Sequence, residues 1–197
     1  MAQTGFVIWP PYEVFYIHSM LFNTQSAARS IEVLSTVMSH LTESKDADPF
    51  AAIDTEDVLN HLQNIVVQGA ALSRYFWPAR KGYERRGEYL RQALGITDQN
   101  PLKSRGLRNS MEHFDEKLDG YLSGGIVGNV FPQYLGPLPK DDGVPRHIFR
   151  AYYTDVGEFE MLGNRYQIEP IAKELLRLDE ALMKCDKEGG RLPRPTP

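Results

Sequence analysis

Arg108, Asn109 and His113 have the residue types and spacing best suited to catalysis in this chain. A guanidinium can neutralise a phosphate, an amide can orient it, and an imidazole can exchange a proton near neutral pH. Residues four apart lie one turn apart on a helix, so Asn109 and His113 share a face and Arg108 flanks them. With Leu107 at the centre of the apolar stripe, that face points away from the core. The set therefore predicts phosphodiester binding and proton transfer.

The same residues also allow simpler interpretations. An outward histidine is usually only solvated, and Arg108 can pair with Glu112 or Asp115. An arginine four to six residues before a histidine arises readily by chance, whereas the narrower order of arginine, asparagine, three residues and histidine is rare. The narrower pattern therefore carries the prediction.

Basic residues cluster in the stretch that leads to this set, although the whole chain has a formal net charge of −4. Residues 74–108 hold nine basic and three acidic side chains, with aromatic residues among them. Such a block can follow a phosphate backbone while its rings stack on bases. The candidate RNA contacts are Lys81, Arg85, Arg86 and Arg105. The alternative is a solvated helix face with Phe76 and Trp77 in the core.

Helical periodicity covers most of the chain before residue 123. The predicted helices span residues 12–40, 55–77, 83–94 and 101–122. Asp54 is the expected N-cap of the second, Gly95 ends the third, and Asn100 and Pro101 begin the fourth. The expected stripe of the first is Phe15, Ser19, Phe22, Ala27, Ile31, Leu34, Met38 and Leu41. That of the fourth is Leu107, Met111, Phe114, Leu118, Tyr121 and Leu122.

The remaining third of the chain has a different pattern. Residues 123–145 are rich in glycine and proline and are expected to form a loop. Strand-like runs at 147–153, 158–162 and 165–168 predict a small β-hairpin or meander, and a final helix is expected over 169–184. The expected organisation is a helical bundle over 1–122, the loop, a hairpin plus C-terminal helix over 146–185 packed on the bundle, and a flexible tail over 186–197.

Composition narrows the class of protein. With 42% hydrophobic and 24% charged residues, the chain is typical of a globular protein. Its lone cysteine, Cys185, excludes an intramolecular disulfide and a cysteine-rich zinc site. The histidines lack metal-ligand spacing, so neither a metal nor a cofactor is expected. The N-terminus lacks a secretory pattern and no stretch is long and apolar enough for a membrane span, which predicts a cytoplasmic protein.

The segment from Arg108 to His113 resembles the signature of the HEPN superfamily, in which an arginine and a polar residue precede a histidine. The resemblance covers about the first 120 residues and implies a mainly α fold with a bundle of about four helices. The C-terminal hairpin and final helix are additions to it. Family members are similar to metal-independent endoribonucleases of toxin–antitoxin, defence and RNA-processing systems, and usually act as homodimers that join two motifs in one cleft.

Carried over to this chain, the resemblance implies that His113 exchanges protons during RNA cleavage. Arg108 would stabilise the transition state and Asn109 would orient the phosphate, giving a 2′,3′-cyclic phosphate and a 5′-hydroxyl. The expected partners are RNA, a second copy of the chain, and an antitoxin or another protein. The alternative hypothesis is a non-catalytic helical module that binds a protein or a nucleotide; a degenerate member that keeps the motif for structure is a third.

Overall fold

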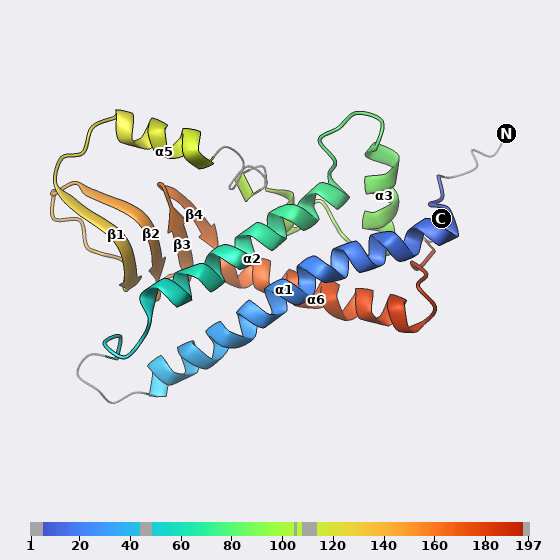
Figure 1. Cartoon of the computed structure of the whole chain (residues 1–197), viewed down its shortest axis with the longest axis horizontal. Helices are drawn as coiled ribbons and strands as arrows, with labels where there is room; N and C mark the ends of the chain where they lie inside the picture. Colours follow the sequence, from blue (N-terminus) through green and yellow to red (C-terminus); the bar gives the residue numbers. More distant parts are fainter. Residues whose placement is uncertain (1–5, 44–48, 105, 108–113, 195–197) are drawn as a thin grey trace.

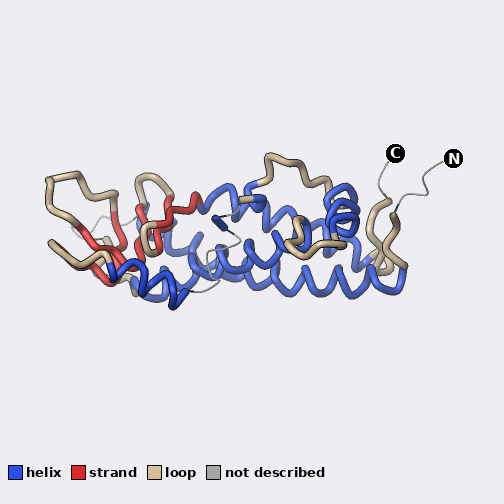
Figure 2. Tube along the Cα trace, turned by 90° about the horizontal axis from the view of Figure 1, so that it is seen from above, coloured by secondary structure: helices blue, strands red, loops and turns tan. Residues whose placement is uncertain are grey.

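The computed structural model describes residues 6–43, 49–104, 106–107 and 114–194, and within them the chain is mainly α-helical with one four-stranded sheet. In chain order the elements are α1 (Pro10–Glu43), α2 (Thr55–Phe76), α3 (Glu84–Ala93), the short 3₁₀ helix η1 (Pro101–Lys103), α5 (Phe114–Ser123), β1 (Asn129–Gly136), β2 (Arg146–Tyr153), β3 (Glu158–Met161), β4 (Asn164–Gln167) and α6 (Ile168–Lys187). Figure 1 shows α1, α2 and α6 side by side, with the sheet near one end of α2 and α3 near the other. Figure 2 shows the strands gathered at one end of the long axis.

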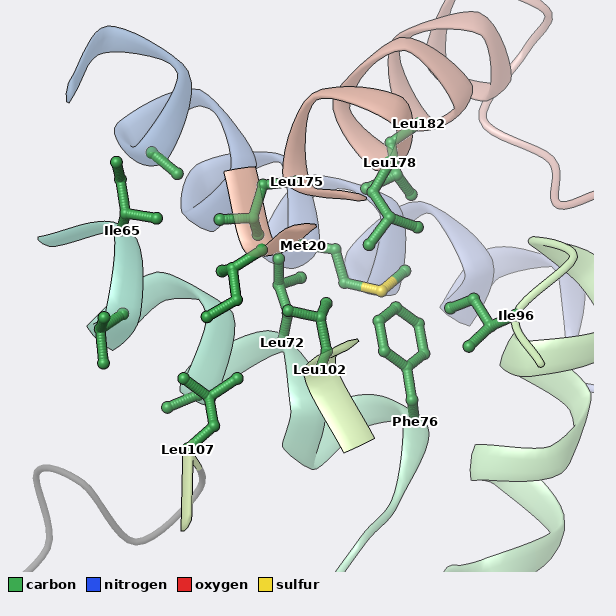
Figure 3. Packing of buried hydrophobic residues seen from close by; sticks show 14 of the residues in the cluster. Met20, Ile65, Leu72, Phe76, Ile96, Leu102, Leu107, Leu175, Leu178 and Leu182 are labelled. Carbon is green, nitrogen blue, oxygen red and sulfur yellow. The ribbon is translucent and has the colours of Figure 1, made fainter. Parts of the chain in front are cut away.

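The three long helices enclose the main apolar core. Met20 of α1, Phe76 of α2 and Leu178 of α6 are each fully buried there. Figure 3 shows their side chains directed toward one another. Helix α6 buries the face that its periodicity predicts, including Leu175 and Leu182. Apolar packing between these helices is therefore the main stabilising contribution to this layer.

Several helix boundaries confirm the sequence signals. The Asp54 carboxylate accepts hydrogen bonds from the backbone N–H groups of Glu56 and Asp57 at the start of α2. Helix α2 ends before Trp77, and Gly95 follows α3 with a φ of +64°. Local capping chemistry thus sets these ends.

The stripe predicted for α1 is partly wrong. Phe15 and Phe22 are predicted in the core but are exposed, whereas Ile17, Met20 and Leu21 are buried. The two sets are alternative apolar stripes on the same helix, and only packing against α2 and α6 selects between them. Ala27 and Leu34 are buried as expected.

The continuous helix predicted over 101–122 is also wrong, because it is broken at Ser104. Asn100 accepts the N–H of Leu102, but the element that it caps is only the three-residue η1, and Ser104 has extended backbone angles. A Cβ added at Gly69 of α2 would meet both Leu102 and Leu107. Residues five apart in one helix point about 140° apart. The break lets both leucines pack over Gly69.

In α5 the predicted apolar stripe is only partly buried. Leu118 and Tyr121 pack against the main core, as expected, but Leu122 is exposed. Leu107 is buried, and Met111 lies outside the described residues.

The sheet has the order β1-β2-β3-β4. The predicted meander is confirmed, because β2, β3 and β4 pair antiparallel. The loop expected over 123–145 is wrong in its middle, since β1 pairs parallel with β2, placing Val130 opposite His147 and Tyr134 opposite Ala151. Pro132 lies inside β1, a residue that strands accept mainly at sheet edges, and β1 is an edge strand. This pairing has no local sequence signal.

The C-terminal segment differs from the flexible tail expected from residue 186. Helix α6 continues to Lys187, and the chain then returns to α1. Arg191 Nε donates to Glu13 Oε2 at 2.8 Å, the Leu192 N–H donates to the same oxygen at 3.0 Å, and Leu192 is buried. No described helix is long and apolar enough to cross a membrane.

Candidate functional site

The catalytic candidates Arg108, Asn109 and His113, and the RNA-binding candidate Arg105, lie outside the described residues. The residues that flank them are described. Leu107 is buried against α2, and α5 begins with exposed Asp115 and Glu116 in its first turn. The candidate motif therefore connects a core anchor to a helix whose first turn is acidic.

Arg86, another RNA-binding candidate, lies among three tyrosine rings. Its guanidinium carbon is 5.7 Å from the Tyr16 centroid, 5.9 Å from that of Tyr75 and 5.7 Å from that of Tyr83. Arg86 Nη2 also donates to the Arg74 carbonyl at 3.3 Å. The three rings come from α1, α2 and the start of α3. Arg86 therefore joins these elements through cation–π contacts, and its half-buried side chain is less available to a phosphate than an exposed one.

Arg91 also has a structural role. Its Nη1 donates to the carbonyl oxygen of Phe76, at the C-terminal end of α2, and its guanidinium lies over the Trp77 ring. A cation at this end of a helix binds carbonyls that lack a partner within the helix. This part of the basic block holds α3 against α2.

Exposed cations lie next to these residues. Lys81 and Arg85, both RNA-binding candidates, are exposed, and neither forms an ion pair with a described residue. Arg80 is also exposed and lies over the Tyr83 ring, 5.4 Å from its centroid. The structure thus separates the predicted basic block into arginines that brace the fold and cations that face solvent.

A serine, a histidine and an aspartate meet between α1 and α2, an arrangement that sequence reasoning missed. Ser30 Oγ lies 3.1 Å from His61 Nδ1, and His61 Nε2 lies 3.5 Å from Asp57 Oδ1. Ser30 is buried, and its Oγ also accepts from Asn64 Nδ2 at 2.9 Å. A nucleophilic serine must reach substrate, which this one does not. These residues form a polar contact between two helices.

Two other described histidines, His147 and His18, also have partners within the structure. His147 Nδ1 lies 3.3 Å from Tyr121 Oη, and its Nε2 lies 3.2 Å from the Val127 nitrogen and 3.1 Å from the Val127 carbonyl oxygen. These contacts join β2 to α5 and to the chain before β1. His18 Nε2 pairs with Asp186 at 3.0 Å. Among the described residues, no group of three or more histidine, cysteine or acidic side chains could hold a metal ion.

Two buried carboxylates also have structural partners. Glu13, besides binding the C-terminal segment, lies 3.4 Å from Tyr89 Oη, and burial followed by the charge of Glu13 raises the pKa of Tyr89. Glu160 accepts from Tyr153 Oη at 2.9 Å and from Arg165 Nε at 2.8 Å. Burial, and then the hydrogen bond to Glu160, hold the pKa of Tyr153 far above its ordinary value. Each carboxylate thus fixes a local structure.

No protein-family model matches the chain, and no curated protein or solved structure shows significant similarity to it.

Proposed function

We propose that the protein is a HEPN-like endoribonuclease that cleaves RNA without a metal ion, acting in the cytoplasm as a homodimer. One observation carries the proposal: Arg108 and Asn109 precede His113 with the spacing that the superfamily uses. In this proposal two copies of the motif face each other in one cleft. The biological setting is a toxin, defence or RNA-processing system, with an antitoxin or another protein as its regulator.

The proposed reaction requires only proton transfer and charge stabilisation. His113 takes the proton from an RNA 2′-hydroxyl, and the oxygen attacks the adjacent phosphorus. The bond to the 5′-oxygen breaks, and that oxygen takes a proton from a protonated His113 imidazole of the dimer and leaves as a 5′-hydroxyl. The other product is a 2′,3′-cyclic phosphate. Arg108 stabilises the added negative charge at phosphorus, and Asn109 orients the phosphate.

The described neighbours of the motif are compatible with this proposal. Leu107 anchors the chain in the core directly before the motif. Lys81 and Arg85 supply exposed positive charge on a protein with a net charge of −4, so a polyanion has a local site of attraction. Asp115 and Glu116 oppose it, and neutralisation by basic residues of either subunit would offset their charge.

Cleavage of a mixed-sequence structured RNA in excess EDTA tests the proposal. The wild type should produce cyclic phosphate ends, while Arg108→Ala and His113→Ala should each lose at least about 100-fold in rate. His40→Ala and Arg194→Ala change exposed residues of the same types elsewhere and should cleave normally. Equal cleavage by all variants would indicate a contaminating nuclease and contradict the assignment.

A second candidate function is a non-catalytic helical interaction module, which binds a nucleotide or a partner protein through the polar motif face. The exposed rings of Phe15 and Phe22 on α1 favour a binding role that needs no chemistry. Absence of cleavage with every RNA tested, together with capture of a partner that Arg108→Ala and His113→Ala abolish, would support this module over the nuclease.

A further inference from the structure

The first half of α1, together with Trp9 directly before it, presents a row of aromatic side chains to solvent. The exposed fractions are 60% for Trp9, 55% for Tyr12, 73% for Phe15 and 76% for Phe22. Trp9 and Tyr12 contact each other edge to face with centroids 4.9 Å apart. Phe15 and Phe22 are seven residues apart, so they lie on one side of the helix, about 10 Å from each other along its axis. We call these four residues the aromatic row.

Helix α1 itself adds no exposed negative charge to the aromatic row, and the carboxylate beside the row, Asp186 of α6, is paired with His18 at 3.0 Å. From residue 12 to residue 28, the sole acidic residue is Glu13. Glu13 is buried, and its carboxylate binds Arg191 and the Leu192 N–H. A polyanion that approaches this stretch of α1 therefore meets no exposed carboxylate on it, in contrast to the acidic first turn of α5.

The exposed cations lie beside the aromatic row. Ser19 of α1 hydrogen-bonds Tyr75 of α2, with 2.5 Å between their hydroxyl oxygens. Tyr16, on the next turn of α1, contacts Arg86 of α3. Figure 1 shows α3 above this half of α1; the segment leading into α3 carries Arg80 and Lys81, and the first turn of α3 carries Arg85.

Exposed rings next to cations suit one class of ligand. Single-stranded nucleic acid offers unstacked bases that stack on aromatic side chains, while its phosphates are attracted to lysine and arginine. A duplex keeps its bases stacked and would interact with the cations alone. An apolar protein partner would use the rings but would gain little from the adjacent positive charge.

We propose that the aromatic row, together with Arg80, Lys81 and Arg85, forms a binding surface for single-stranded RNA. The choice of RNA rests on the proposed nuclease function, whereas the preference for unpaired bases rests on the exposed rings. The surface deepens that function by selecting unpaired RNA as the substrate class. It also assigns a role to Phe15 and Phe22, which packing leaves outside the core.

Fluorescence anisotropy separates binding from cleavage. The probe is a 5′-fluorescein-labelled 20-nucleotide RNA without self-complementarity, either alone or annealed to its complement. Measurements use the full chain carrying His113→Ala, in EDTA. In this background, the single strand should bind at least about tenfold more tightly than the duplex. Phe15→Ala and Phe22→Ala should each weaken single-strand binding by about 5- to 100-fold and leave duplex binding unchanged.

The cations give a second, independent readout. Replacing Arg80, Lys81 and Arg85 by alanine should reduce the slope of log affinity against log salt by about 0.7 for each phosphate that the protein no longer neutralises. Val127→Ala and Lys140→Ala change exposed residues beside the sheet, away from the aromatic row, and should bind as the background does. Circular dichroism and size-exclusion chromatography of every variant check that folding and oligomeric state are retained.

Each outcome bears on the surface separately from the nuclease. Loss of binding in the ring variants supports the surface even if the wild type cleaves no RNA, which would count only against the nuclease. Unchanged single-strand binding in both ring variants overturns the surface even if EDTA-resistant cleavage is observed. Equal affinity for strand and duplex overturns it, as does a change in oligomeric state without a change in RNA affinity, which would identify a protein interface.

Discussion

The layer of α1, α2 and α6 shares one large buried cluster, whereas the sheet is divided between two. Phe159 and Met161 of β3 belong to the main cluster, but Ile148, Ala151 and Tyr153 of β2 form a separate small one. Its partly buried neighbours, such as Tyr134, come from β1 and the loop after it. The helical layer therefore depends on apolar area, while the outer part of the sheet depends more on backbone pairing and on individual polar contacts.

The difference also concerns sequence distance. Within α2 and α6, periodicity and caps identify each helix from residues close along the chain. The β1–β2 pair instead forms only when the two strands come together in parallel, after the chain has returned through the loop of residues 137–145. Disrupting β1 should therefore leave the helical layer folded, whereas disrupting the core of the helical layer should also unfold the sheet. Four predictions test this, from the largest expected effect to the smallest.

Phe76→Ala should have the largest effect. The side chain is fully buried between the long helices, so its removal leaves a cavity and should lower the free energy of unfolding by about 3–5 kcal/mol. Phe22→Ala is the matched control on the exposed side of α1 and should change it by less than about 0.5 kcal/mol. Urea titration followed by circular dichroism measures both. Similar losses would mean that the layer is not held by this core.

Glu13→Ala tests the buried polar anchor between α1 and the C-terminal segment. The substitution leaves the Leu192 N–H without its acceptor and should lower the free energy of unfolding by about 2–4 kcal/mol. Glu13→Gln should lower it by less, because the amide keeps an oxygen that can accept this hydrogen bond. Loosening of this segment should also speed alkylation of Cys185, which is buried and whose pKa burial raises. Iodoacetamide labelling followed by mass spectrometry measures this rate, with exposed Glu32→Ala as the control. An unchanged labelling rate would show that the contact with Glu13 does not control access to Cys185.

Gly128→Ala should weaken the β1–β2 pair selectively. Gly128 has a φ of +105°, and an added Cβ would lie 2.2 Å from the Pro145 carbonyl oxygen, so strain of about 1–3 kcal/mol is expected. Gly125→Ala has a similar φ of +78° but open space around it, which makes it the matched control. Hydrogen exchange should rise in residues 129–136 and remain unchanged in α2 and α6. A uniform rise throughout the chain would contradict the separation of the two regions.

Tyr153→Phe should have the smallest effect, about 1 kcal/mol, because it removes one hydrogen bond while Glu160 keeps Arg165. It also gives a pH test. Since the pKa of Tyr153 is raised on folding, its contribution is complete below the unfolded value of about 10 and declines as pH rises above it. Between about pH 9 and pH 11, the wild type should therefore lose more free energy of unfolding than Tyr153→Phe. Equal losses would show that this hydroxyl does not contribute.

The candidate site could be predicted only in part. Sequence order alone supplies the motif from Arg108 to His113 and the basic block, because both are local patterns. It could not show that Arg86 is packed among rings from three elements, since Tyr16 lies 70 residues away in the chain. A signal for the aromatic row was present, because α1 carries more apolar residues than one buried stripe can hold. Periodicity by itself does not show which of two such stripes is buried and which is exposed.

By itself, the sequence determined the helical character of this protein, the ends capped by Asp54 and Gly95, the β2–β4 meander and the buried face of α6. Each follows from side chains that are neighbours in the chain or one helical turn apart. Tertiary structure decided which face of α1 is buried, the break at Ser104, the pairing of β1 with β2, and the anchoring of Leu192 by Glu13. These features depend on contacts between distant segments, whose free energy appears only when the whole chain has packed.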